Sequence, residues 1–203
     1  MLPCAIVLAG GKSSRFGSDK AMADIGGVTL TEFTVSGLLR VFSRVLVVAK
    51  DPEKLGLDPD ERVRLVRDES STYAALVGII EGLKSSSHVL NYITGCDMPA
   101  VEPGLISVLY SLVRGKDCAL RCDETGMPQP MGGFYSKRAL ARLELFMEQG
   151  EFRLSTVIRA LDITPAPFEL VRSLDPELRS SWNVNTPEDL AHISTLQNSI
   201  ARG

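Results

Sequence analysis

The chain has 203 residues, of which 44% are hydrophobic and 23% charged, and its formal net charge is −3. These proportions are typical of a water-soluble globular protein, and the length suits one domain over residues 1–203. The small negative charge, with cations spread along the chain, gives no electrostatic reason to expect nucleic acid as a partner.

The sequence also argues against a membrane or secreted protein. No uninterrupted apolar run approaches the roughly 20 residues that span a bilayer. No basic segment precedes the first apolar run, which argues against a signal peptide. The four cysteines, Cys4, Cys96, Cys118 and Cys122, form no Cys-x-x-Cys pair or familiar zinc spacing, so we interpret them as small buried hydrophobes. We therefore predict a cytoplasmic location.

The first distinctive stretch joins an apolar run to a glycine-rich loop. Residues 5–9 lack polar alternation, which predicts a strand buried on both faces, as in a parallel sheet. Gly10 and Gly11 can adopt positive φ and bring bare backbone amides close to phosphate oxygens. Arg15 can hold such oxygens through its planar guanidinium, and Lys20 would act as a compact charge. The stretch predicts a polyphosphate-binding loop; a surface turn with scattered charge is the simpler alternative.

The next elements complete a βαβ unit and a third strand. Apolar residues at helical spacing favour a helix over 29–42, and an apolar run favours a buried strand over 44–49. Residues 50–62 are polar with prolines, which predicts a loop or a short irregular helix. A strand over 63–67 ends at Asp68, whose carboxylate could accept hydrogen bonds from a ligand. An Asx turn or a helix N-terminal charge explains Asp68 equally well.

A second carboxylate follows the fourth strand. We predict a helix over 73–84 and a strand over 89–94 that ends at Gly95, with Asp97 directly beyond it. Open α/β sheets place their chemistry at this end of a strand. Magnesium takes oxygen ligands and usually only one or two carboxylates, so Asp97 is the candidate metal ligand. Its simpler interpretation is a turn residue or a helix cap.

The second half is less regular. We predict, in order, a helix over 103–114, a strand over 117–122, an extended segment over 127–135, helices near 137–148 and 154–162, a loop over 164–168, a strand near 168–172, and a final helix that Thr186, Pro187 and Asp189 begin. The extended segment could be the acceptor side of a site or an edge strand with a bulge. The alternation of strands and helices predicts a three-layer α/β/α fold, mostly parallel with an antiparallel strand.

Several separated segments resemble one family in the right order. The glycine loop lacks the spacing of dinucleotide folds and of P-loops. From Leu8-Ala9-Gly10-Gly11 through Arg15-Phe16-Gly17 to Asp19-Lys20, it instead resembles the signature of nucleotidylyltransferases, most closely the molybdenum cofactor guanylyltransferases. The same resemblance extends to Asp68, Gly95-Cys96-Asp97-Met98-Pro99, residues 129–135 and Asn183-Val184-Asn185-Thr186-Pro187. It therefore covers essentially the whole chain.

The resemblance implies a Rossmann-like fold of the nucleotide-diphospho-sugar-transferase type. It implies a catalytic set of Arg15, Lys20 and Asp97, and a nucleotide-binding set of Leu8, Ala9, Gly10, Gly11, Lys20, Asp68, Asp97, Asn183 and Asn185. Asp97 would bind both GTP and magnesium. The two asparagines would orient the acceptor or help to hold the metal.

The reaction that this family implies is magnesium-dependent transfer of GMP from GTP to the terminal phosphate of molybdopterin, with release of pyrophosphate. The implied partners are GTP, molybdopterin or the molybdenum cofactor, and cofactor-delivery proteins or acceptor molybdoenzymes. The N-terminal half would hold the donor nucleotide and the C-terminal half the acceptor.

Two departures from the family pattern leave the base and acceptor open. Many relatives have Gly-Pro-Leu-Ala-Gly where this chain has Ala-Ala-Leu-Val-Gly at residues 74–78. An asparagine often follows the second strand, where this chain has Ala49-Lys50. The alternatives are a cytidylyltransferase for the same pterin, an NTP transferase for another phosphorylated acceptor, and a non-catalytic nucleotide-binding module.

Overall fold

The structure is a computed structural model that describes residues 1–10, 20–58, 60–186, 188–191 and 193. Within these residues, seven strands form one mixed sheet in the order β5-β4-β1-β6-β8-β7-β9, and β2 and β3 form a separate antiparallel pair. The strands are β1 (Leu2–Leu8), β2 (Asp24–Ile25), β3 (Val28–Thr29), β4 (Phe42–Ala49), β5 (Val63–Arg67), β6 (Leu90–Gly95), β7 (Cys118–Arg121), β8 (Gly133–Ser136) and β9 (Ile163–Ala166).

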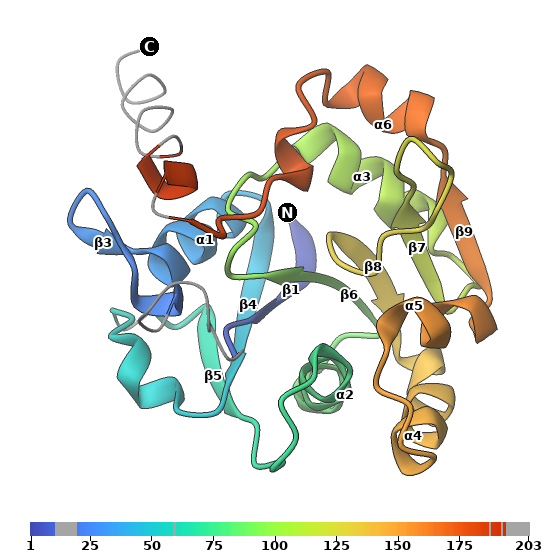
Figure 1. The fold of residues 1–203 in the computed structure, drawn as a ribbon, viewed down its shortest axis with the longest axis horizontal. Coiled ribbons are helices and arrows are strands. Elements are labelled where there is room, and N and C mark those ends of the chain that lie inside the picture. The colour runs from blue at the N-terminus through green and yellow to red at the C-terminus, as the bar shows by residue number, and fades with distance from the viewer. Residues whose placement is uncertain (11–19, 59, 187, 192, 194–203) are drawn as a thin grey trace.

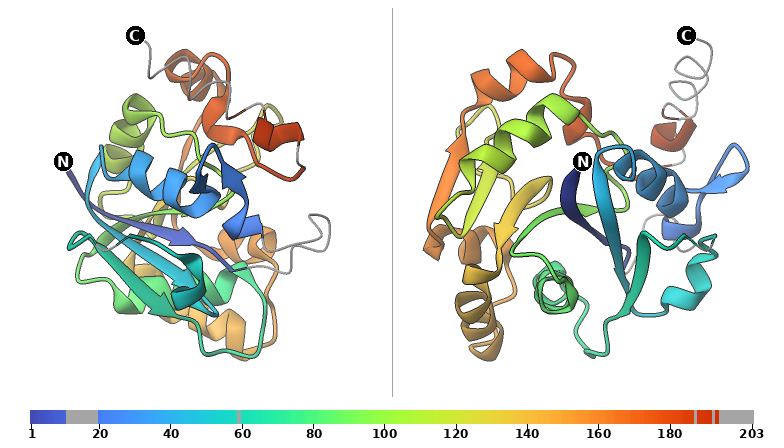
Figure 2. Two further views of the ribbon diagram at one scale, coloured as in Figure 1. Left: turned by 90° about the vertical axis from the view of Figure 1, so that its left-hand side faces the viewer. Right: turned by 180° about the vertical axis from the view of Figure 1, so that it is seen from behind.

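Helices cover both faces of the sheet (Figures 1 and 2). They are α1 (Leu30–Leu38), α2 (Ala75–Ser85), α3 (Pro103–Leu112), α4 (Leu140–Glu148), α5 (Leu154–Val157) and α6 (Phe168–Leu174). Short 3-10 helices are η1 (Lys20–Met22), η2 (Pro52–Leu55), η3 (Lys137–Ala139), η4 (Ile158–Ala160) and η5 (Arg179–Ser181). One core packs α1, α3 and α6 against the sheet, and a second core packs α2, α4 and α5 against the opposite face. The predicted three-layer α/β/α fold is confirmed.

The central strand β1 explains the two cores. Its side chains alternate between them, with Ala5 and Val7 in one core and Ile6 in the other, all fully buried. The unbroken apolar run follows from this burial on both faces. Gly82 lets α2 approach β1 closely, because a Cβ at this position would lie 2.5 Å from Ile6 Cγ2.

The order of the strands reverses at β1: β4 and β5 are added on one side of it, and β6 is added on the other side. Strand β1 pairs in parallel with β4 on one side and with β6 on the other, so that Leu8 lies opposite both Val48 and Gly95. Beyond β6 the neighbour is β8, which runs antiparallel, as predicted for the second half. In open α/β sheets, ligands bind outside the carboxyl ends of the strands at such a switch point. A ligand is therefore expected to bind at the segments that follow β1, β4, β5 and β6.

Most predicted elements are confirmed, but the helix over 29–42 and the elements over 164–172 need correction. The helix predicted over 29–42 ends at Leu38, because β4 already begins at Phe42. The loop predicted over 164–168 and the strand predicted near 168–172 are both wrong: strand β9 covers Ile163–Ala166, and helix α6 begins at Phe168. Strand β9 lies at the edge of the sheet, where a proline is tolerated although it has no N–H to donate to a neighbouring strand. In α6, Val171 is buried and Leu174 packs beside it, so the apolar spacing is helical.

None of the described helices combines the length and the apolar character needed to cross a bilayer.

Candidate functional site

The end of β1 is fixed between its two neighbours at the switch point. The amide of Ala9 donates to the Val48 carbonyl at 2.8 Å, and the amide of Cys96 donates to the Leu8 carbonyl at 3.1 Å. The chain therefore leaves β1 at Gly10 between the segments that follow β4 and β6. Gly11 and Arg15 lie outside the described residues.

Lys20, Asp97 and Asn185 meet although the sequence separates them widely. Lys20 Nζ donates to Asp97 Oδ2 at 2.8 Å and to Asn185 Oδ1 at 3.2 Å. The side chains of Lys20 and Asp97 are 17% and 28% exposed, so the ion pair is half-buried and still open to a ligand. The structure thus brings together three of the residues that the family resemblance selected.

The backbone after β6 holds Asp97 in a defined turn. The Met98 amide donates to the Gly95 carbonyl at 3.2 Å, and Thr34 Oγ1 donates to the Cys96 carbonyl at 2.8 Å. A Cβ on Gly95 would lie 2.3 Å from Asp97 Oδ1. Only glycine leaves room for the carboxylate in this position, which explains the glycine two residues before the aspartate.

The asparagine segment is anchored by the valine between its two asparagines. Val184 is fully buried in a small core with Ile25 and Leu30, and its amide donates to the Asp97 carbonyl at 2.8 Å. Because alternate side chains of an extended segment point in opposite directions, Asn183 and Asn185 are exposed. Figure 1 shows this segment returning from α6 toward α1.

The two asparagines have different partners. Asn185 contacts Lys20, whereas Asn183 Nδ2 donates to the Ser181 carbonyl at 3.1 Å. The predicted helix start after them is confirmed: Asp189 Oδ2 accepts from the amides of Asn185 and Thr186, and the Asp189 amide donates to Thr186 Oγ1 at 3.2 Å. Pro187 lies outside the described residues. Residues 188–191 are helical.

A second polar cluster follows β4 and β5. Lys50 Nζ lies 2.8 Å from Asp68 Oδ2, and the two side chains are 19% and 9% exposed. Lys50 also donates to the carbonyls of Ser70 and Thr72, and its ammonium lies 5.1 Å from the centre of the Tyr73 ring. Asp68 Oδ1 accepts from the Ser70 amide at 3.0 Å, so the Asx-turn interpretation of this carboxylate is also correct.

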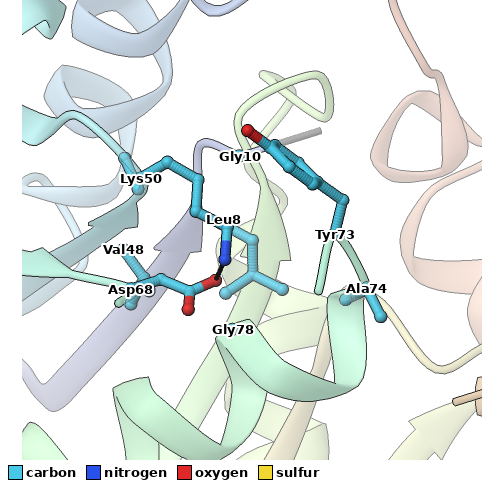
Figure 3. Close-up of a pocket in the computed structure, with 10 residues that line it drawn as sticks. Leu8, Gly10, Val48, Lys50, Asp68, Tyr73, Ala74 and Gly78 are labelled. Carbon is cyan, nitrogen blue, oxygen red and sulfur yellow. Dashed lines mark ion pairs between the residues drawn. The ribbon is translucent and has the colours of Figure 1, made fainter. Parts of the chain in front are cut away.

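This cluster lines a pocket beside the end of β1 (Figure 3). Its lining residues are Leu8, Gly10, Val48, Ala49, Lys50, Asp68, Tyr73, Ala74, Ala75 and Gly78. Figure 3 shows Lys50 reaching toward Asp68, with Tyr73 facing the pair. Helix α2 begins at this wall, and no side chain caps its first amides at Ala74. The pocket therefore offers a cation, a carboxylate, an aromatic ring and the start of a helix.

Sequence reasoning did not select Lys50 or Tyr73 as site residues. A signal for Lys50 was present, since it directly follows β4, and β4 neighbours β1 at the carboxyl edge of the sheet. The position of Tyr73 depends on how the loop after β5 folds back, which its sequence does not encode locally.

The donor atoms beside Lys20 fit a magnesium ion. Within the described part of the chain, no group of three or more His, Cys, Asp or Glu side chains could hold a metal alone. The carboxylate of Asp97 and the amide oxygen of Asn185 both lie within hydrogen-bond distance of one atom, Lys20 Nζ. Two hard oxygens that converge in this way suit magnesium, which otherwise takes waters and phosphate oxygens.

The segment over 127–135 is not an edge strand. Its last residues form β8, which lies inside the sheet between β6 and β7, so the edge-strand alternative is wrong. A Cβ on Gly133 would lie 2.6 Å from Leu120 Cδ2, so this glycine allows close contact with β7. The buried Tyr135 donates its hydroxyl to the Pro130 carbonyl at 2.7 Å, which fixes the approach to β8.

Comparison with known proteins agrees with this geometry. The family model described as MobA-like NTP transferase domain matches residues 5–164. A protein of Chloroflexus aggregans named probable molybdenum cofactor guanylyltransferase is 36% identical, with 94% of this chain and 92% of the relative covered. A molybdenum cofactor guanylyltransferase of Desulfosudis oleivorans is 31% identical, with 91% of each chain covered.

A solved structure extends the likeness to the fold. The crystal structure of molybdopterin-guanine dinucleotide biosynthesis protein A from Archaeoglobus fulgidus superposes with a TM-score of 0.81 at 25% identity, covering 98% of this chain and 100% of the other. The residues that the family model matches include β1, β4, β5 and β6, and Lys50, Asp68 and Asp97 follow three of these strands. The chain therefore belongs to the MobA-like NTP transferase family.

Proposed function

We propose that the chain is a molybdenum cofactor guanylyltransferase, which transfers GMP from GTP to the terminal phosphate of molybdopterin and releases pyrophosphate. The observation that carries the proposal is the convergence of Lys20, Asp97 and Asn185 at the carboxyl edge of β1 and β6. A non-catalytic nucleotide-binding module would have little need of a lysine, a carboxylate and an amide oxygen at one point.

The donor nucleotide would lie across the end of β1. The pocket of Lys50, Asp68 and Tyr73 would receive its nucleoside end, because it offers charged hydrogen-bonding groups beside an aromatic ring. The phosphates would lie along the backbone of residues 8–10, between this pocket and Lys20. Gly11 and Arg15, outside the described residues, are proposed to hold the β- and γ-phosphates.

The chemistry requires little from a general base. A phosphate oxygen of the acceptor attacks the α-phosphorus of GTP, and the bond between that phosphorus and the oxygen leading to the β-phosphorus breaks, so pyrophosphate leaves. The nucleophile is already an anion, so positioning and charge stabilisation dominate the rate. Lys20 would share its ammonium between Asp97 and the phosphate oxygens of the nucleotide.

The residues proposed to hold magnesium are Asp97 and Asn185, whose oxygens already converge on one cation. When bound, magnesium would neutralise the negative charge of the phosphates. We further propose that residues 1–203 act as one domain, with the donor in the N-terminal half and molybdopterin in the C-terminal half, from which the product passes to molybdoenzymes. The four cysteines, all buried and all described, are thiols and not disulfides, which supports a reducing, cytoplasmic location.

The direct test is release of pyrophosphate from GTP, CTP and ATP, each with and without molybdopterin and magnesium. We expect release with GTP only when molybdopterin and magnesium are both present. Turnover with CTP but not GTP would overturn the choice of base, and turnover with none would overturn the function. The variant Asp97→Asn keeps the size of the side chain and should reduce turnover at least about 100-fold by removing the charge.

A further inference from the structure

Arg121 is a buried cation with an unusual set of partners. It ends β7, is only 5% exposed, and lies at the carboxyl edge of the sheet. Its Nη1 donates to Ser180 Oγ at 3.2 Å and to Ser181 Oγ at 2.9 Å, while its Nε finds no hydrogen-bond partner among the described residues. Burial lowers the pKa of the guanidinium. Burying a guanidinium whose Nε has no hydrogen-bond partner among the described residues is costly, so a neutral side chain would be the simpler way to fill the space.

The two serines belong to η5, which is held from its other side by a buried carboxylate. Asp175 is 2% exposed, and its two oxygens accept from the amides of Arg179 at 2.9 Å and Ser180 at 2.8 Å. Two side chains of opposite charge therefore hold η5: Asp175 accepts from backbone amides of this turn, and Arg121 donates to its serine hydroxyls. Leu178, just before the turn, has a φ of 52°, a left-handed conformation that a leucine adopts only where the surroundings impose it.

The clamped turn leads directly to the polar cluster. The Trp182 amide donates to the Arg179 carbonyl at 3.0 Å, and Asn183 Nδ2 donates to the Ser181 carbonyl at 3.1 Å. The next two residues are Val184, whose amide holds the Asp97 carbonyl, and Asn185, whose side chain accepts from Lys20. A short series of hydrogen-bonded residues thus joins Arg121 to the site.

Space for the guanidinium is provided by a glycine in the acceptor-side segment. Gly132 has a φ of +72°, and a Cβ there would lie 3.3 Å from Arg121 Cζ. The rigid plane of the guanidinium holds one nitrogen, Nη1, where it reaches both hydroxyls, whereas the ammonium of a lysine is a point charge on a flexible stem. The glycine and the arginine together suit this bridging contact rather than a charge alone.

We propose that Arg121 is a positioning residue of the transfer reaction, which with Asp175 clamps η5 and thereby sets Asn185 beside Lys20 and Asp97. This inference rests on the proposed function for its kinetic effect, although the clamp itself can be tested without turnover.

The test uses Arg121→Lys and the double variant Ser180→Ala/Ser181→Ala, which keeps the arginine and removes only its two acceptors. Ser107→Ala is the matched control, because it removes an exposed hydroxyl that donates to the Pro103 carbonyl within α3, whereas the hydroxyls of Ser180 and Ser181 accept from Arg121. The first readout is acrylamide quenching of Trp182, the one tryptophan in the sequence, which lies next to the clamp. We expect about a twofold rise in the quenching constant for both clamp variants and no change for the control, because a released turn exposes the ring more often.

The second readout separates positioning from structural support. We expect kcat to fall about 10- to 100-fold in the clamp variants while KM for GTP changes less than about threefold, because a displaced Asn185 misplaces reacting groups. Adding Asn185→Ala to the double variant should then cost little more, since both changes remove one function.

Two results would overturn the inference. One is a lower thermal midpoint of the clamp variants together with wild-type kcat per folded molecule and unchanged quenching. This would mean that Arg121 only stabilises the fold and does not position Asn185. The other is full additivity of the Asn185→Ala and serine changes. If the wild-type chain releases no pyrophosphate, the proposed function fails, and the quenching experiment still decides whether Arg121 holds η5.

Discussion

Gly95→Ala tests whether the position of the Asp97 carboxylate limits the reaction. The backbone of Gly95 does not have a positive φ, so the backbone conformation itself permits alanine. Its Cβ would lie 2.3 Å from Asp97 Oδ1, whereas ordinary contacts begin at 3.4 Å. The carboxylate must therefore withdraw by about 1 Å, and a misplacement of that size can reduce a rate about 100-fold. This corresponds to about 2.7 kcal/mol of transition-state stabilisation.

The assay is magnesium-dependent pyrophosphate release from GTP with molybdopterin, compared with Gly104→Ala. At Gly104 the nearest atom to a new Cβ is Leu174 Cδ2 at 3.9 Å, an ordinary contact, so this control should keep wild-type turnover. Circular dichroism and the thermal midpoint would establish that both variants are folded. A folded Gly95→Ala variant with kcat within a factor of two of wild type would refute the argument that Asp97 needs this position.

Three further predictions concern the two polar clusters and the thiols. Lys20→Met should weaken GTP binding by about 1.5 to 3 kcal/mol, the value of a charge-assisted contact, and unchanged affinity in calorimetry would exclude the contact. Lys50→Met should lower the free energy of unfolding by about 1 to 3 kcal/mol in urea titrations, because Asp68 would stay buried without its cation; a loss below about 0.5 kcal/mol would contradict this. Burial raises the pKa of Cys118 to about 12, so this thiol is neutral at pH 8, and it should react with a disulfide reagent at least about 100-fold more slowly than in the urea-unfolded chain. A fast native reaction, mapped to Cys118 by mass spectrometry, would show that the strand opens readily.

Elements whose cause is local could be predicted from the sequence. Strand β1 is fully apolar because it is buried on both faces, and the predicted strand over 63–67 coincides with β5. The start of the last helix also depends on neighbours in sequence, since Thr186 and Asp189 cap each other. The role of Asp97 could be proposed because a glycine and a strand end mark it locally.

The remaining features depend on contacts between distant segments. Strand β9 can contain Pro165 because it pairs with β7 at the edge of the sheet. The residue pattern over 163–174 does not predict this edge position. Lys50 pairs with a carboxylate from the next strand, and the sequence alone shows only a lysine after an apolar run. Arg121 ends a strand of otherwise ordinary composition, and its serine partners lie 59 and 60 residues away.

The meeting of Lys20 with Asp97 and Asn185 spans 77 and 165 residues, and it has a consequence for how the substrates bind. Asp97 carries one negative charge, and Lys20 already occupies it at 2.8 Å. A magnesium ion that arrives alone would have to share that single charge with an ammonium group, and like charges at such distances repel. A triphosphate brings negative charge of its own, which lets both cations stay near the carboxylate. If magnesium is the metal, as proposed, we expect it to bind together with the nucleotide and not as a resident ion.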